Sequence, residues 1–151
     1  MKSIAFQWTA CDVILQNPME GEKRKILIVD DDNFLLDMYA LKFSQNNFEV
    51  YTAPGGAQAI EKLKGGLNPS VMLMDIIMPE MDGFEMLAQI NMQNLCPKCA
   101  KIVLSNKSEQ KDIDEGNRLG VAGYIVKANS TPTEVIDQVV KILENKVIFP
   151  K

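Results

Sequence analysis

Short apolar runs and amphipathic segments alternate along the chain from residue 25 to residue 145. The runs are rich in valine, isoleucine, leucine and methionine, a composition typical of strands buried on both faces of a sheet. They cover residues 25–29, 48–53, 71–75, 101–105 and 123–127. Because parallel strands need crossover connections, the alternation predicts a doubly wound, five-stranded parallel sheet. We expect an α/β fold of three layers, with helices on both faces of the sheet.

Five helices are expected after these strands. The first begins at Asp32 or Asn33 and presents Phe34, Met38 and Leu41 at helical spacing as its apolar face. The other four are expected over residues 57–64, 83–91, 108–119 and 133–145. The last helix carries the widest apolar stripe, which predicts that most of it packs on the sheet: Val135, Ile136, Val139, Ile142 and Leu143.

Residues 1–22 do not share this alternation. We therefore divide the chain into an N-terminal segment, residues 1–22, and one domain, residues 23–151. The segment ends in a polar stretch typical of a linker, and Met19 would serve as an alternative start. Its simplest interpretation is a leader, a tag or a dispensable extension. Trp8 and the apolar residues 13–15 leave open a short element that docks on a partner.

Composition excludes several classes of function. The 151 residues carry a net charge of −4 and no basic stripe, so we expect no nucleic-acid partner. The absence of histidine excludes histidine-ligated metals and histidine-based triads. Three cysteines without a secretory signal favour a reducing compartment. No apolar run approaches the roughly 20 residues of a membrane span, so we expect a cytoplasmic protein with no membrane partner.

Acidic, hydroxyl and amino side chains end the predicted strands. Strand one runs into residues 30–32, all aspartate, strand three ends in Asp75, strand four in Ser105 and strand five in Lys127. The carboxyl ends of parallel strands meet at one edge of the sheet, where such folds bind ligands. Clustered carboxylates favour a hard cation such as Mg²⁺, and a lysine and a hydroxyl suit a phosphoryl group. The set predicts a site with an acidic nucleophile, Mg²⁺ and a phosphoryl group.

Four strings of this sequence resemble the signatures of bacterial response-regulator receiver domains: ILIVDDD, MLMDIIMPEMDG, IVLSN and GYIVKA. The resemblance covers about residues 25–145 and includes the chemotaxis-type receivers that stand alone. It implies a flavodoxin-like sheet of order 2-1-3-4-5. It also implies a phosphorylation-dependent receiver of a two-component system. Such a domain is not an enzyme and assists only its own phosphorylation and dephosphorylation.

The resemblance also implies a role for each matching residue. Asp75 matches the phosphoacceptor, and Lys127 matches the lysine that contacts the phosphoryl group. Asp30 and Asp31 match the acidic pair that holds Mg²⁺ together with Asp75, and the backbone carbonyl of Ile77 would be a further ligand. Two more residues match switch positions, Ser105 and Tyr124. We expect Asp32 to be a helix cap rather than a ligand.

The implied partners follow from the same resemblance. A histidine kinase or a histidine phosphotransfer protein would supply the phosphoryl group, since this chain has no histidine. Phosphorylation would draw Ser105 inward, and Tyr124 would turn into the space that it leaves. The face made by the fourth helix, fifth strand and fifth helix would then control an unknown output protein. The chain would be a monomer or a weak dimer through that face.

Three residues depart from the usual pattern of the family. Ala128 stands where proline usually follows the lysine, often after a cis peptide, and we expect a trans bond here. Asn106 stands where a small residue usually leaves room for the phosphodonor, so it would line the pocket or slow small donors. The apolar Ile77 cannot orient an attacking water, which predicts slow self-dephosphorylation.

Cys96 and Cys99 form a C-x-x-C pair ahead of strand four. Redox-active pairs usually open a helix after a strand, and no second pair is present for zinc. The simpler interpretation is two loop or partly buried thiols. The alternative is a regulatory disulfide.

Two alternatives concern function as a whole. A Mg²⁺-dependent phosphatase of the haloacid-dehalogenase type would use Asp30 as its nucleophile and Asp32 as its acid. That family lacks the MP-x-MDG string and needs a further acidic pair after its lysine. Here Glu134, Asp137 and Glu144 follow Lys127, all within the last helix. The other alternative is a receiver excised from a larger regulator or hybrid kinase.

Overall fold

The computed structural model describes residues 22–144 of the chain. Residues 1–21, which include Cys11 and all but the last residue of the N-terminal segment, and residues 145–151 lie outside the described residues. Five strands are present: β1 (Arg24–Val29), β2 (Phe48–Ala53), β3 (Val71–Met74), β4 (Ala100–Ser105) and β5 (Gly123–Val126). The helices are α2 (Asn33–Ser44), α3 (Gly56–Lys64), α4 (Gly83–Met92), α5 (Gln110–Arg118) and α6 (Pro132–Leu143), with a short 3₁₀ helix, η1 (Lys127–Asn129).

The five strands form one parallel sheet of order β2-β1-β3-β4-β5. This confirms the predicted doubly wound fold and its strand order. The strand order reverses at β1, whose neighbours are β2 and β3. The crevice beside this reversal, at the carboxyl ends of β1 and β3, is where open α/β sheets bind ligands.

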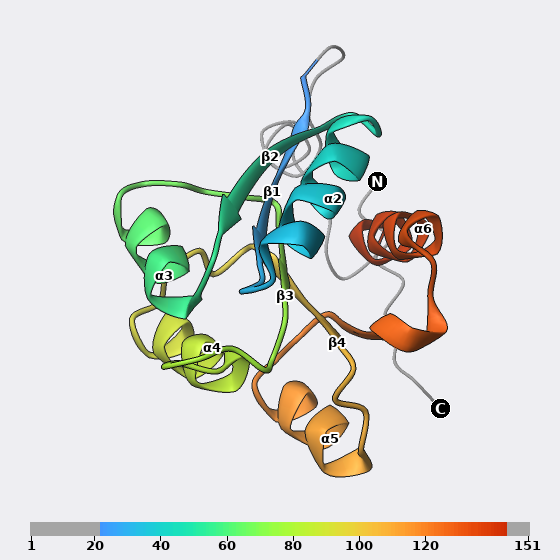
Figure 1. The fold of residues 1–151 in the computed structure, drawn as a ribbon. Helices are drawn as coiled ribbons and strands as arrows, with labels where there is room; N and C mark the ends of the chain where they lie inside the picture. The colour runs from blue at the N-terminus through green and yellow to red at the C-terminus, as the bar shows by residue number, and fades with distance from the viewer. Residues whose placement is uncertain (1–21, 145–151) are drawn as a thin grey trace, which may run out of the picture.

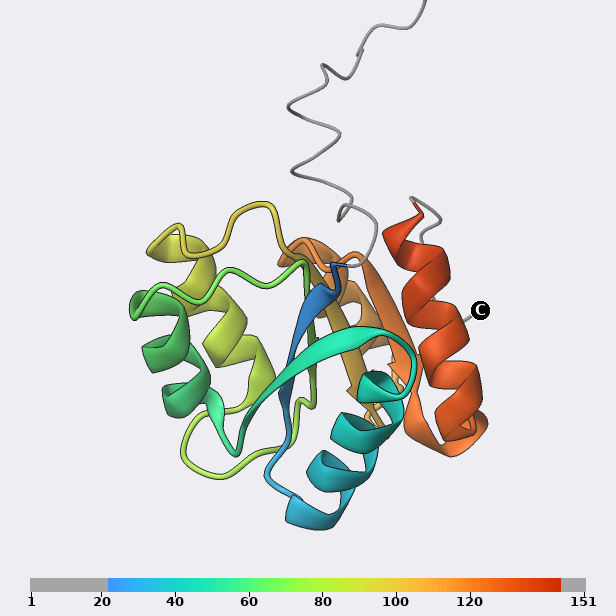
Figure 2. The same cartoon turned by 90° about the horizontal axis from the view of Figure 1, so that it is seen from above.

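Helices cover both faces of the sheet (Figure 1). Seen from above, α2 and α6 lie on one side of the strands and α3 and α4 on the other (Figure 2). The two faces alternate along β1, because successive side chains of a strand point in opposite directions. Leu27 and Val29 join the core under α3, α4 and α5, while Ile26 and Ile28 join the core under α2 and α6.

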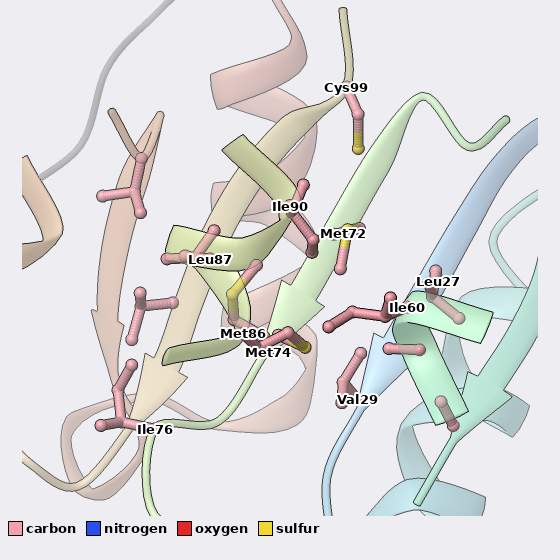
Figure 3. Packing of buried hydrophobic residues seen from close by; sticks show 14 of the residues in the cluster. Leu27, Val29, Ile60, Met72, Met74, Ile76, Met86, Leu87, Ile90 and Cys99 are labelled. Atoms are coloured by element: carbon pink, nitrogen blue, oxygen red, sulfur yellow. The ribbon is translucent and has the colours of Figure 1, made fainter. Parts of the chain in front are cut away.

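Methionines fill much of the core under α3 and α4. Met72 and Met74 of β3 both point into it and are fully buried, as their spacing predicts (Figure 3). They pack with Met86 and Ile90 of α4. Flexible thioether side chains adapt to irregular gaps, which suits this position between helix and sheet.

The first helix is rotated relative to the sequence prediction. Of the three residues predicted for its buried face, Met38 packs against the core, but Phe34 and Leu41 are 77% and 58% exposed. Leu36, Tyr39 and Phe43 face the sheet instead. The segment carries apolar residues on both sides, so its periodicity alone does not distinguish the two faces. The predicted stripe of the last helix is confirmed, with Val135, Ile136, Val139 and Ile142 buried.

The helix ends carry side-chain caps where the sequence offers them. Asp82 accepts a hydrogen bond from the amide of Glu85, the third residue of α4, and the two form a capping box. Thr131 and Glu134 form the same arrangement at the start of α6.

Among residues 22–144, no helix combines the length and the apolarity needed to cross a bilayer.

Candidate functional site

Three aspartates meet at the carboxyl edge of the sheet, where β1 and β3 end. The amide of Asp30 donates to Ala53 and that of Asp75 donates to Val29, so both residues continue the sheet ladder. One carboxylate oxygen from each of Asp30, Asp31 and Asp75 lies within 4.8 Å of the others. The sequence therefore predicts this cluster correctly, because neighbouring parallel strands bring their ends together.

Lys127 lies just after β5 and reaches across the site to two of these aspartates. Its ammonium nitrogen is 2.8 Å from Asp30 Oδ2 and 2.9 Å from Asp75 Oδ2. The side chains of all three residues are at most 13% exposed. An ion pair at this depth is screened much less than a surface pair. Lys127 is thus the cation that balances the carboxylates in this structure.

Burial and charge pull the pKa values of this group in opposite directions. Burial raises the pKa of Asp30, and hydrogen bonds from Lys127 and from the Asp32 amide offset only part of that effect. Burial also disfavours the charge on Lys127, but its hydrogen bonds to Asp30 and Asp75 outweigh burial and raise the pKa of the ammonium. Lys127 therefore keeps its positive charge beside Asp30 and Asp75.

The Asp75 carboxylate is held by the backbone of its own loop. Its Oδ1 accepts hydrogen bonds from the amides of Ile76, at 2.7 Å, and Ile77, at 3.4 Å. These two donors orient the carboxylate and leave Oδ2 beside Lys127. The Ile77 side chain is 61% exposed at the rim of the site.

Gly83, in the sequence string that includes Asp75, lies directly against this loop. A Cβ atom at Gly83 would be 2.3 Å from the Asp75 carbonyl oxygen and 2.9 Å from the Ile76 Cα. Both neighbours are backbone atoms, which cannot move aside like the end of a side chain. The amide of Gly83 also donates to the Ile76 carbonyl, so glycine here fixes the loop that follows Asp75.

The residues present fit a divalent cation. Asp30, Asp31 and Asp75 offer carboxylate oxygens, which are the ligands that Mg²⁺ prefers in proteins. Burial disfavours the charged form of Asp30, and a cation bound beside the carboxylate would offset that effect. Asp32 is outside the cluster: its Oδ1 accepts from the Leu35 amide at the start of α2, which confirms the expected helix cap.

Ser105 ends β4 but forms no hydrogen bond with Asp75 in the part of the chain described. Its hydroxyl is fully buried, and its oxygen accepts a hydrogen bond from the Lys107 amide at 3.2 Å. The hydroxyl hydrogen is therefore free to donate to another group.

Tyr124 already lies inside the protein. Its ring is 1% exposed, and its hydroxyl donates to the Lys107 carbonyl. Burial, with the charges of Asp112 and Asp75, raises the pKa of Tyr124 to about 12. The Tyr124 ring is therefore buried in the state described, and its turn on phosphorylation stays a prediction.

Two contacts that fix the loop after β4 are not predicted by the sequence. Lys107 pairs with the buried carboxylate of Asp112 in α5 at 3.1 Å. Asn106 Oδ1 accepts from the Ala128 amide at 2.8 Å. Proline at position 128 would have no such donor, so the departure from the usual pattern creates the contact. No cis peptide occurs among residues 22–144, which confirms the expected trans bond before Ala128.

Comparison with known proteins agrees with this geometry. The model of the family described as response regulator receiver domain matches residues 26–140. The transcriptional regulatory protein PhoP of Bacillus subtilis (alkaline phosphatase synthesis) is 30% identical over 83% of this chain and 50% of its own length. SrrA, a transcriptional regulatory protein of Staphylococcus aureus, is 33% identical over 79% of this chain and 47% of its own.

A solved structure shares the whole fold. The chemotaxis protein CheY4 of Vibrio cholerae superposes with a TM-score of 0.73 at 26% identity, over 80% of this chain and 98% of the CheY4 chain. The chain described here thus matches a complete small receiver in structure. By contrast, it spans about half the length of the curated relatives that it matches.

Proposed function

The chain belongs to the family of response regulator receiver domains, and from this membership we propose that Asp75 is the residue that accepts the phosphoryl group. The family fixes the general function as a phosphoryl-accepting signal receiver. One observation carries the assignment of the residue. Lys127 binds Asp75 and Asp30 at the same time, so the strand ends form one charged site around the Asp75 carboxylate.

The chain's own residues supply most of the chemistry of transfer. Asp75 Oδ1 is held by backbone amides, which leaves Oδ2 to form the new bond to phosphorus. The bond between phosphorus and the donor nitrogen breaks, and the donor imidazole keeps the electron pair. Lys127 moves from the carboxylate to the phosphoryl oxygens, which carry more negative charge.

Mg²⁺ completes this site in our proposal. Asp30, Asp31 and Asp75, with the backbone carbonyl of Ile77, would hold it. When bound, it supplies positive charge that offsets the charge of the transferred group. Lys127 neutralises part of the cluster before the metal arrives.

The loop from Ser105 to Lys107 is positioned to read the phosphoryl group. Ser105 can donate its hydroxyl hydrogen to a phosphoryl oxygen, which would draw the loop toward Asp75. Lys107 would move with this loop. Its carbonyl accepts the hydrogen bond from the Tyr124 hydroxyl, and its ammonium pairs with the Asp112 carboxylate. The signal would therefore reach α5, β5 and α6 through this loop.

We propose that a histidine kinase or a histidine phosphotransfer protein donates the phosphoryl group, because these 151 residues contain no histidine of their own.

The output partner would bind the face of α5, β5 and α6, and we also propose that the chain forms a weak dimer through that face. The free thiols of Cys96 and Cys99 support a cytoplasmic location. That no nucleic acid takes part stays a prediction, since PhoP and SrrA are transcriptional regulatory proteins.

Stoichiometry of labelling tests this function. With Mg²⁺ and a small phosphodonor such as acetyl phosphate, the purified chain should carry at most one phosphoryl group, and consumption of the donor should then fall to the slow rate of self-dephosphorylation. A phosphatase that uses Asp30 would instead turn over a generic phosphoester many times. Rapid turnover of a generic phosphoester, or no labelling with any phosphodonor, would contradict the proposal.

A further inference from the structure

A second chemically distinct site lies at the opposite edge of the sheet from Asp75. Cys96 and Cys99 lie in the loop that leads from α4 into the amino end of β4. Cys99 belongs to the core and lies at the end of the cluster remote from Ile76, the residue after Asp75 (Figure 3). The phosphoryl-accepting function does not use either thiol.

We propose that Cys96 and Cys99 are a redox-active pair that closes to an intramolecular disulfide when a hydroperoxide oxidises Cys96. Hydrogen peroxide and organic hydroperoxides are the chemical class of oxidant. The proposal goes beyond the receiver function and does not depend on it.

The backbone already holds the two cysteines at bonding range. The Cys99 amide donates to the Cys96 carbonyl at 3.1 Å, which closes a four-residue turn. Such turns keep their end Cα atoms within about 7 Å, close to the range of about 4.4–6.8 Å that disulfides require. The pKa of each thiol is shifted by the other, which requires the two side chains to lie close together.

The two thiols differ in the way that an attacking and a resolving cysteine differ. Cys96 is partly exposed, whereas Cys99 is only 6% exposed. The hydrogen bond with Cys99 and the charge of Lys101 lower the pKa of Cys96 to about 7, against the opposing effect of burial. The same hydrogen bond and burial raise the pKa of Cys99. Cys96 is therefore the thiolate that an oxidant meets.

A buried lysine supports an anion at this place. Lys101 is only 7% exposed, and its ammonium donates to the Cys96 carbonyl at 3.0 Å. Within residues 22–144 it makes no ion pair with a carboxylate, so the Cys96 thiolate is the negative charge available to it. The Cys96 thiol now lies 3.4 Å from Asn68 Oδ1, and a half turn of that amide would present its NH₂ to a thiolate.

The proposed reaction balances in two steps. The Cys96 thiolate attacks one peroxide oxygen, the O–O bond breaks, and hydroxide leaves to give a sulfenic acid. The Cys99 sulfur then attacks the Cys96 sulfur, the S–O bond breaks, and a second hydroxide leaves. The two hydroxides take up the thiol protons, so one peroxide is reduced to two waters while two thiols become one disulfide.

The test uses the full chain with Cys11→Ser, so that only these two cysteines remain. We expect equimolar hydrogen peroxide to remove two hydrogens from the intact mass and to block alkylation of both thiols, and dithiothreitol to reverse both effects. Cys99→Ser should stop at a sulfenic acid that dimedone traps at Cys96. Cys96→Ser should not react, because Cys99 is buried. Two free thiols after peroxide, or only disulfides between chains, would overturn the proposal.

A pH profile on the same unoxidised protein identifies the attacking thiol. Alkylation of Cys96 under native conditions should rise with a midpoint near pH 7. Lys101→Gln keeps a hydrogen-bond donor to the Cys96 carbonyl but removes the positive charge, so alkylation of Cys96 at pH 7 should be slower in this variant. A Cys96 midpoint at the ordinary value of about 8.5 would contradict the assignment of Cys96 as the attacking thiol.

Discussion

The ammonium nitrogen of Lys127 lies 2.9 Å from Oδ2 of Asp75, although 52 residues separate the two in the chain. The same nitrogen is 2.8 Å from Asp30. One buried cation thus holds the ends of β1, β3 and β5 together. Its removal would leave two buried carboxylates facing each other.

We expect Lys127→Met to lower the free energy of unfolding in the absence of Mg²⁺ by about 2 kcal/mol, because the carboxylates lose their counter-charge. Saturating Mg²⁺ should stabilise this variant more than the wild type, since the metal would replace the missing charge. Urea unfolding with EDTA and with Mg²⁺ measures both effects. Lys111→Met removes an exposed pair with Glu109 and should change little. Equal stability of Lys127→Met and wild type without metal would refute the account.

Metal affinity should separate the three consecutive aspartates. Asp30→Asn and Asp31→Asn should each weaken Mg²⁺ binding by at least about tenfold, because each removes a charged ligand. Asp32→Asn is the matched control, since it removes the adjacent charge but an asparagine still caps α2. Calorimetric titration with Mg²⁺ gives the three affinities. A loss in Asp32→Asn as large as in Asp30→Asn would mean that overall charge, not ligation, decides binding.

The hydrogen bond from the Ala128 amide to Asn106 Oδ1 can be tested by replacing Asn106, which supplies the acceptor. Asn106→Ala leaves the Ala128 amide without its partner and should cost about 1 kcal/mol of stability. Asn106→Asp keeps an acceptor oxygen at the same position and should retain most of the stability. Thermal or urea unfolding of the two variants compares them directly. If both lose the same stability, the hydrogen bond contributes nothing.

The sequence predicts the charged cluster but not the contacts around it. Asp30, Asp75 and Lys127 end strands, and the parallel sheet brings strand ends together whatever the side chains do. The contact of Asn106 with Ala128 depends on how two loops 22 residues apart meet, which no local pattern encodes. In the sequence, Asp112 does not differ from the other polar residues of its helix, yet its carboxylate is buried beside the Lys107 ammonium.

The error at α2 has a related cause. Phe34 and Leu41 are at helical spacing, but Leu36, Tyr39 and Phe43 are as well, and only the packing against the sheet selects the second set. Phe34 is left exposed as a result. Local periodicity predicts that the helix forms, whereas tertiary contact decides its rotation.

The exposed Ile77 should prolong the lifetime of the phosphorylated state. Its side chain lies at the rim of the site and offers no group that could orient an attacking water. We expect Ile77→Asn to release phosphate several-fold faster, because an amide can hold that water near Asp75. A phosphate-release time course on labelled protein measures the rate, with Ile77→Val as the apolar control. An unchanged lifetime in Ile77→Asn would show that this position does not control hydrolysis.

Covalent labelling of the chain and its variants identifies the residue that accepts the phosphoryl group. The wild-type chain and two variants are incubated with acetyl phosphate and Mg²⁺, and the covalent phosphoryl group is counted by intact mass. Asp82→Asn is the control, since it removes a nearby carboxylate but an asparagine still caps α4. We predict one phosphoryl group on the wild type and on Asp82→Asn, and none on Asp75→Asn. Equal labelling of Asp75→Asn and wild type would contradict the account.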